Sequence, residues 1–140
     1  MKLGYSTWAM PKIPIDTSIK FLSETGYDGI TIATLPQFTT SINNLDIEER
    51  KRILNLSKLY SIPITSVMSF TNLMEENKES LKNNIKFVND SIDLANDWGT
   101  NCLITGIGGK PNELEDIQKS EEFIERISEL GLMAKSKGVT

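Results

Sequence analysis

Residues 24–34 read ETGYDGITIAT, and we call them the organising stretch because their pattern recurs along the chain. Gly26 suits the left-handed backbone position that follows a helix, where a residue with a Cβ is strained. Residues 27–29 have the composition of a turn, and residues 30–33 form a short apolar run typical of a buried strand. The segment therefore predicts the end of a helix, a tight connection and a strand.

The same order of helix end, connection and apolar strand recurs along the chain. Residues 60–63 lead into ITSVMSF, residues 98–101 lead into CLITGIGG, and the sequence ends in KGVT. The expected strands start near residues 2, 29, 62, 101 and 139, with a first strand over residues 2–7. This recurrence predicts βα units stacked around a parallel sheet.

Four amphipathic helices are expected between these strands. In the third, apolar residues recur at spacings of four, three, four and three, which places them on one helical face: Leu81, Ile85, Val88, Ile92 and Ala95. Trp98 is predicted to close this helix as a core residue, with Gly99 as its cap. Asp46 and Glu49 predict a capping box at the start of the second helix. The other predicted faces are Ile15, Ile19 and Leu22, then Ile53, Leu56 and Tyr60, and finally Phe123, Ile127, Leu130 and Ala134.

The spacing of the units favours a closed barrel over an open sheet. A (β/α)8 barrel of about 250 residues has roughly 31 residues in each unit, which this chain approximates over four units. A flavodoxin-like doubly wound sheet would need a fifth strand and a closing helix, for which no residues remain. We therefore expect an α/β fold in which the chain supplies about the first four βα units of a (β/α)8 TIM barrel.

Composition narrows the function further. The net charge of −4 lacks the basic excess of a nucleic-acid-binding protein, and no apolar run resembles a signal peptide or a membrane span. The single cysteine, Cys102, is expected to be a small buried hydrophobic residue in a cytoplasmic protein. The absence of histidine removes the Ser-His and Cys-His nucleophile pairs and the commonest zinc ligand.

Function in such folds belongs at the carboxyl ends of the strands and in the loops that follow. Hydroxyl and amide groups there would suit a sugar, and Trp8 and Met10 could supply an apolar wall. The alternative is that strand-end hydroxyls only satisfy neighbouring backbone groups. Residues 106–110, GIGGK, match no complete phosphate-binding motif but could approach an anion. The predicted substrate-binding residues are Thr7, Trp8, Met10, Thr34, Ser69, Thr105 and Lys110, with Phe70, Asn72 and Gly106 in the same loops.

Three segments of the chain carry a family resemblance. KLGYST (2–7), GYDGITI (26–32) and AKSKGVT (134–140) resemble the N-terminal part of the sugar phosphate isomerase/epimerase family, whose fold is the xylose isomerase-like TIM barrel. The resemblance implies that residues 1–140 are the N-terminal half of one such domain. It implies a divalent metal (Mn, Mg, Co or Zn) in the intact enzyme, held by carboxylates and a histidine that begin at the end of the fifth strand.

The chain departs from the family pattern at several strand ends. Its second strand ends in Thr34 where an acidic residue is common, and Ser69 and Thr105 stand where histidine is common. The resemblance therefore implies a fragment without metal ligands, and no catalytic residue is assigned. The absent histidines and the acidic charge also disfavour the DNA-binding endonuclease IV-like branch.

Two functions remain open. The first is a sugar or sugar-phosphate isomerase or epimerase, in which metal-assisted proton transfer occurs next to a carbonyl in the intact protein. The second is a non-catalytic sugar-binding or regulatory barrel. In both, the expected partner is a small sugar or sugar phosphate, with no nucleic acid and no membrane. Four strands without the other half of the barrel would also expose strand edges, which favours self-association.

Overall fold

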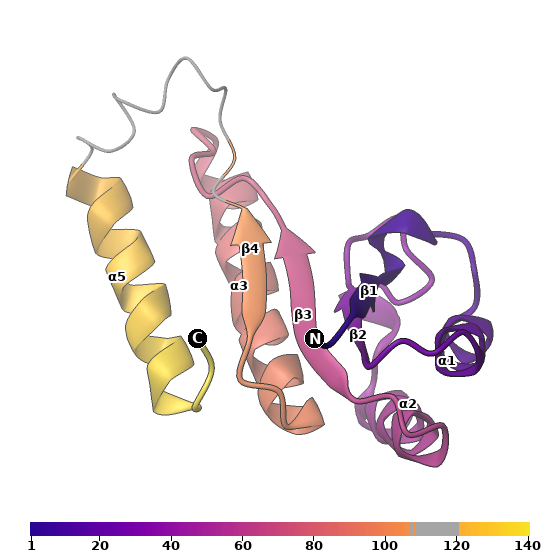
Figure 1. Ribbon diagram of the computed structural model, residues 1–140. Helices are drawn as coiled ribbons and strands as arrows, with labels where there is room; N and C mark the ends of the chain where they lie inside the picture. The colour runs from indigo at the N-terminus through magenta and orange to yellow at the C-terminus, as the bar shows by residue number, and fades with distance from the viewer. Residues whose placement is uncertain (107, 109–120) are drawn as a thin grey trace.

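The computed structural model describes residues 1–106, 108 and 121–140. Its sheet contains four parallel strands in the order β1-β2-β3-β4 (Figure 1). This sequential strand order confirms the first four units of a barrel, because the strands of a doubly wound sheet do not follow one another in sequential order. The strands are β1 (Gly4–Ser6), β2 (Gly29–Ala33), β3 (Ile64–Phe70) and β4 (Leu103–Gly106).

Helices follow the strands in alternation. In Figure 1, α3 lies behind β3 and β4, and α5 stands beside it. Two short 3-10 helices follow β1 and β2. The helices are α1 (Ile15–Glu24), α2 (Ile47–Leu59), α3 (Lys78–Trp98) and α5 (Glu121–Ser136), and the 3-10 segments are η1 (Thr7–Ala9) and η2 (Ile42–Asn44).

The organising stretch folds as its composition predicts. Gly26, just after α1, has a φ of 83°, and Gly99 caps α3 with a φ of 69°. At the start of α2 the predicted capping box is half formed. The side chain of Asp46 accepts from the backbone amide of Glu49, but the Glu49 carboxylate binds Arg52 instead of returning to the cap.

The bounds of β1 and β4 differ from the sequence-based expectation. β1 is shorter than residues 2–7, because the Leu3 amide donates to the Asp28 side chain and Thr7 begins a 3-10 turn. β4 begins at Leu103, so Cys102 precedes the strand and is only half-buried. Val139 and Thr140 run beside β4, as expected for an opening fifth strand: Leu103 donates to the Thr140 carbonyl and Thr140 donates to Asn101.

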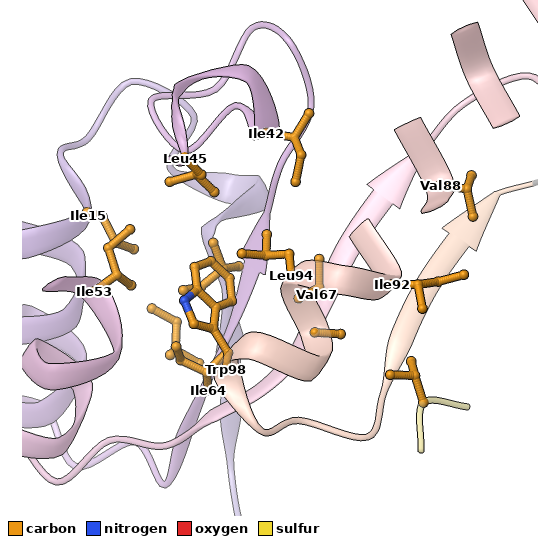
Figure 2. Packing of buried hydrophobic residues seen from close by; sticks show 14 of the residues in the cluster. Ile15, Ile42, Leu45, Ile53, Ile64, Val67, Val88, Ile92, Leu94 and Trp98 are labelled. Atoms are coloured by element: carbon orange, nitrogen blue, oxygen red, sulfur yellow. The ribbon is translucent and has the colours of Figure 1, made fainter. Parts of the chain in front are cut away.

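The main core lies between the sheet and the helices. Figure 2 shows Ile15 of α1 and Ile53 of α2 close together, and Ile92 and Trp98 of α3 in the same cluster. The clustered strand residues include Ile30, Ile32, Ile64 and Val67. The alternate side chains of the strands face the other way, toward what would be the inside of a barrel. That inner face includes Ser6, Thr31, Ala33, Ser66, Met68, Phe70 and Ile104.

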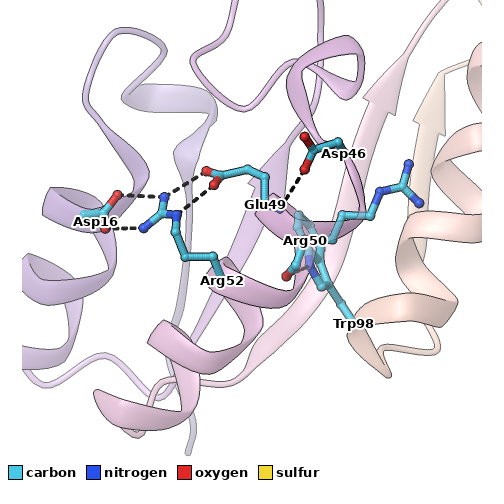
Figure 3. Close-up of polar contacts among 6 residues, drawn as sticks. All are labelled: Asp16, Asp46, Glu49, Arg50, Arg52 and Trp98. Atoms are coloured by element: carbon cyan, nitrogen blue, oxygen red, sulfur yellow. Dashed lines mark hydrogen bonds and ion pairs between the residues drawn. The ribbon is translucent and has the colours of Figure 1, made fainter.

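An ion network on the outer surface joins α1 to α2 (Figure 3). The Arg52 guanidinium contacts both oxygens of Asp16, at 2.5 and 3.0 Å, and its Nε lies 2.7 Å from Glu49. Hydrogen bonding to Arg52 lowers the pKa of the Asp16 carboxyl. The hydrogen bonds that the Arg52 guanidinium donates to Glu49, and then those that it donates to Asp16, raise the pKa of Arg52.

Replacing Asp16 with Asn is expected to cost less than about 1 kcal/mol at neutral pH, because half-exposed ion pairs are screened by water. A carboxyl with a lowered pKa stabilises the folded state above its unfolded pKa and loses that contribution as pH falls below about 4. The difference in the free energy of unfolding between wild type and the Asp16→Asn variant should therefore be smaller at about pH 3 than at pH 5. Urea unfolding at the two pH values measures it, and a constant difference would contradict the ion-pair origin.

Candidate functional site

An aromatic cluster lies at the carboxyl ends of β1, β2 and β3. The ring of Trp8, placed by η1, is 5.2 Å from the ring of Phe70 at an angle of 65°, and 5.7 Å from Phe38. Phe38 packs with Leu35, Ala33 and Met68 in a small second core. Together Trp8, Phe38 and Phe70 form an apolar surface at the end of the sheet where α/β barrels carry their sites.

The three rings of this cluster differ in exposure to solvent. Phe38 is 6% exposed, whereas Trp8 is 44% and Phe70 is 36% exposed. The buried ring supports the two open ones, which keep free area for a ligand. The cluster can therefore offer a ligand a preformed apolar wall.

The predicted threonines make hydrogen bonds between adjacent strand ends. Thr7 Oγ1 accepts from the Ala33 amide at 2.9 Å, and Thr34 Oγ1 donates to the Met68 carbonyl at 3.3 Å. Thr105 Oγ1 donates to the Ser69 carbonyl at 2.7 Å. These contacts match the alternative in which strand-end hydroxyls satisfy backbone groups, and a substrate role for them stays a prediction.

The remaining predicted residues lie in different surroundings. Ser69 is fully buried, and its hydroxyl has no hydrogen-bond partner among the described residues. Met10 is half-buried and packs against the main core. Lys110 lies outside the described residues, as does most of the GIGGK segment. Of the predicted substrate-binding residues, Trp8 is therefore the side chain that the structure places in the aromatic cluster, and Phe70, named with the same strand-end loops, lies beside it.

Sequence reasoning missed two parts of this region. Phe38 of the aromatic cluster and Met68 of the second core are absent from the predicted residues, because a lone Phe in a polar connection and a Met within an apolar strand carry no periodic signal. A pocket of about 550 Å³ between the β2–α2 connection and α3 was also missed. Its lining includes Gln37, Asn43 and Asn83, which only the tertiary fold brings together.

Across residues 1–106, 108 and 121–140, no three His, Cys, Asp or Glu side chains are placed to hold a metal ion. None of the helices in the described part of the chain is long and apolar enough to span a membrane. A cytoplasmic location stays a prediction.

The chain belongs to the xylose isomerase-like TIM-barrel family, whose model matches residues 19–140. This confirms the resemblance inferred from the sequence. No curated protein sequence matches this chain.

Solved structures share the fold at low sequence identity. A D-psicose 3-epimerase crystallised in the presence of D-fructose has a TM-score of 0.76 and 15% identity, over 100% of this chain and 50% of that one. The probable 3-DHS dehydratase AsbF of Bacillus anthracis has a TM-score of 0.75 and 21% identity, over 99% and 50%. The 3-keto-D-glucoside 4-epimerase YcjR of E. coli, in its apo form, has a TM-score of 0.75 and 16% identity, over 100% and 54%. This chain spans about half the length of these proteins.

Proposed function

We propose that this chain forms one side of the substrate pocket of a sugar isomerase or epimerase. The observation that carries the proposal is the aromatic wall of Trp8, Phe38 and Phe70 at the carboxyl end of a xylose isomerase-like sheet. Similar structures include two sugar epimerases, which supports a sugar substrate, although one neighbour is a dehydratase.

The wall would act by positioning the substrate and excluding water. A sugar ring has an apolar face of C–H groups that can lie against the exposed part of Trp8, while its hydroxyls find hydrogen bonds elsewhere in the pocket. Binding on a supported ring limits the orientations of the substrate and lowers the entropic cost of the chemical step. The described residues of the wall supply this positioning, and the three aromatic side chains themselves cannot act as a general acid or base.

The described strand ends do not fit a divalent metal. They present hydroxyls, a thioether and aromatic rings, whereas Mn²⁺, Mg²⁺, Co²⁺ and Zn²⁺ prefer carboxylate or imidazole ligands. We therefore infer that any metal of the intact enzyme is bound by residues other than those described.

Metal titration of residues 1–140 should detect no tight site. Calorimetry with Mn²⁺, Mg²⁺, Co²⁺ and Zn²⁺ is expected to give at most weak, non-stoichiometric binding, since no three of the described carboxylates are placed to hold a metal ion. The full-length protein titrated in parallel is the comparison. A one-to-one site of micromolar affinity in residues 1–140 would contradict the inference.

The function itself is tested on the full-length protein with ketohexoses such as D-fructose and D-psicose, and with keto-glucosides. Isomerised or epimerised product is expected, and Trp8→Ala should lower kcat/KM at least about tenfold, which equals about 1.4 kcal/mol of lost transition-state binding. Phe21→Ala is the matched control, because Phe21 is an exposed aromatic residue on α1. Equal activity of the Trp8→Ala variant and wild type would contradict the role of the wall.

A non-catalytic sugar-binding protein is the second candidate. The absence of acidic residues among the described strand ends near the aromatic wall favours it. Saturable sugar binding that weakens in the Trp8→Ala variant, together with no turnover of any sugar tested, would select this candidate. Self-association of residues 1–140 through strand edges stays a prediction under either function.

A further inference from the structure

The pocket beside α3 has the size and position of a small-molecule site. Its volume of about 550 Å³ falls within the range of roughly 300–1,000 Å³ typical of ligand pockets. It lies at the carboxyl ends of β2 and β3, between the β2–α2 connection and the N-terminal half of α3. It is therefore at the same end of the sheet as the aromatic wall.

Amide side chains supply the polar surface of this pocket. Gln37 and Asn43 come from the β2–α2 connection and Asn83 comes from α3, and all three are exposed. Each amide can both donate and accept, as a sugar hydroxyl also does. The neighbouring Asn84 donates to the Asn72 carbonyl at 2.7 Å and ties the β3–α3 connection to the helix. One wall of the pocket is thus held in place without a ligand.

The charge of the lining favours a neutral ligand. Lys86 and Asp90, one turn apart on α3, form an ion pair, so neither presents an uncompensated charge. By contrast, the groove between α3 and α5 is lined by Glu122, Glu125 and Glu129 with one arginine. A phosphate would find no unpaired cation among the described residues of the amide-lined pocket.

Phe70 connects the pocket to the aromatic wall. Its ring contacts Trp8 and also lines the pocket, so the two sites share one side chain. Leu35, which supports Phe38 in the second core, lines the pocket as well. A ligand that rests against Trp8 would therefore lie beside Phe70, the side chain that the aromatic wall and the pocket share.

We propose that this pocket holds the second sugar ring of a glycoside whose reacting ring lies against Trp8. The proposal rests on the proposed sugar function and narrows its substrate class to glycosides. The apolar face of the second ring would pack on Phe70 and Phe87, and its hydroxyls would bond to Gln37, Asn43 and Asn83.

The test uses the full-length protein labelled with ¹⁵N. Maltose, cellobiose and lactose are titrated while the side-chain amide signals of Gln37, Asn43 and Asn83 are followed, with glucose and galactose as single-ring references. At least one disaccharide is expected to shift these signals. Asn83→Ala should weaken its binding about five- to tenfold, the loss of one or two hydrogen bonds, and leave the affinity for the single ring unchanged.

Asn96→Ala is the matched control, because Asn96 is an exposed asparagine on the same helix and outside the pocket. The proposal is overturned if no disaccharide moves the three amide signals, or if Asn83→Ala and Asn96→Ala have the same effect. Turnover of single-ring sugars, with no disaccharide shifting the three amide signals, would contradict this proposal and still support the proposed function. Disaccharide binding at the amides without any turnover would support a second-ring site in this pocket and contradict the proposed isomerase or epimerase activity.

Discussion

Replacing Trp98 with alanine should lower the free energy of unfolding by about 3–5 kcal/mol, the usual cost of deleting a buried aromatic side chain. Trp98 is 4% exposed and is part of the core cluster at the C-terminal end of α3 (Figure 2). Its indole N–H also donates to the Arg50 carbonyl of α2 at 3.0 Å, so it links two helices. The expected loss is comparable to the whole stability of a small domain, about 5–15 kcal/mol. Urea unfolding followed by circular dichroism measures it.

Trp98→Phe separates packing from hydrogen bonding. Phenylalanine keeps most of the apolar ring and loses only the indole donor, so the expected cost is about 1–2 kcal/mol. The Arg50 carbonyl lies inside α2, where the helical backbone also supplies it with a donor. A Trp98→Phe variant as unstable as Trp98→Ala would mean that the hydrogen bond, and not the packed ring, dominates.

Much of the fold could be predicted because its signals are local. Gly26 and Gly99 mark helix ends by a backbone conformation that glycine adopts without strain, and both have positive φ as expected. Periodicity identified α3, whose Val88, Ile92 and Ala95 are buried. It overestimated the burial of Leu81 and Ile85, which are half-buried and line grooves beside α5. The spacing of apolar residues identifies which face of a helix is buried, but it does not show how much of that face the neighbouring elements cover.

The candidate site was harder to predict because strands buried on both faces show no alternation. Selecting residues by position at strand ends gave Ser69 and Thr105, which pair in register and lie on the same face as Val67 and Leu103 of the main core. The inner face instead carries Met68 and Phe70, one residue away along the strand. A strand position chosen one residue too early or too late therefore selects a side chain on the opposite face of the sheet.

The residues of the amide-lined pocket also could not be predicted from the sequence. Gln37, Asn43 and Asn83 are 6 and 40 residues apart along the chain and belong to no motif. They meet because η2 packs beside α3, which is a tertiary contact. Polar residues in such connections become informative only after the sheet order is known.

Gly29→Ala, in the organising stretch itself, is expected to destabilise the fold by about 1–3 kcal/mol through overpacking. A Cβ at this position would lie 2.5 Å from Thr65 Cγ2 and 3.3 Å from the Pro63 carbonyl oxygen. Thr65 is not free to rotate away, because its hydroxyl donates to the Ile30 carbonyl at 3.1 Å. Thermal and urea unfolding of the variant measure the cost. Gly131→Ala is the matched control: it lies in α5, where no neighbouring atom of the described residues is within 4 Å of the added methyl, and it should stabilise the helix by about 0.5–1 kcal/mol.

Thr65→Ser provides the rescue for Gly29→Ala. Serine keeps the hydroxyl that bonds to Ile30 and removes the Cγ2 that the new methyl would strike. The double variant should therefore recover at least half of the loss, and the two substitutions should show a coupling energy of about 1 kcal/mol. The remaining loss reflects the Pro63 carbonyl, which serine does not move. If the double variant is as unstable as the sum of the single ones, the close approach of β2 to β3 at Thr65 is not what requires glycine at position 29.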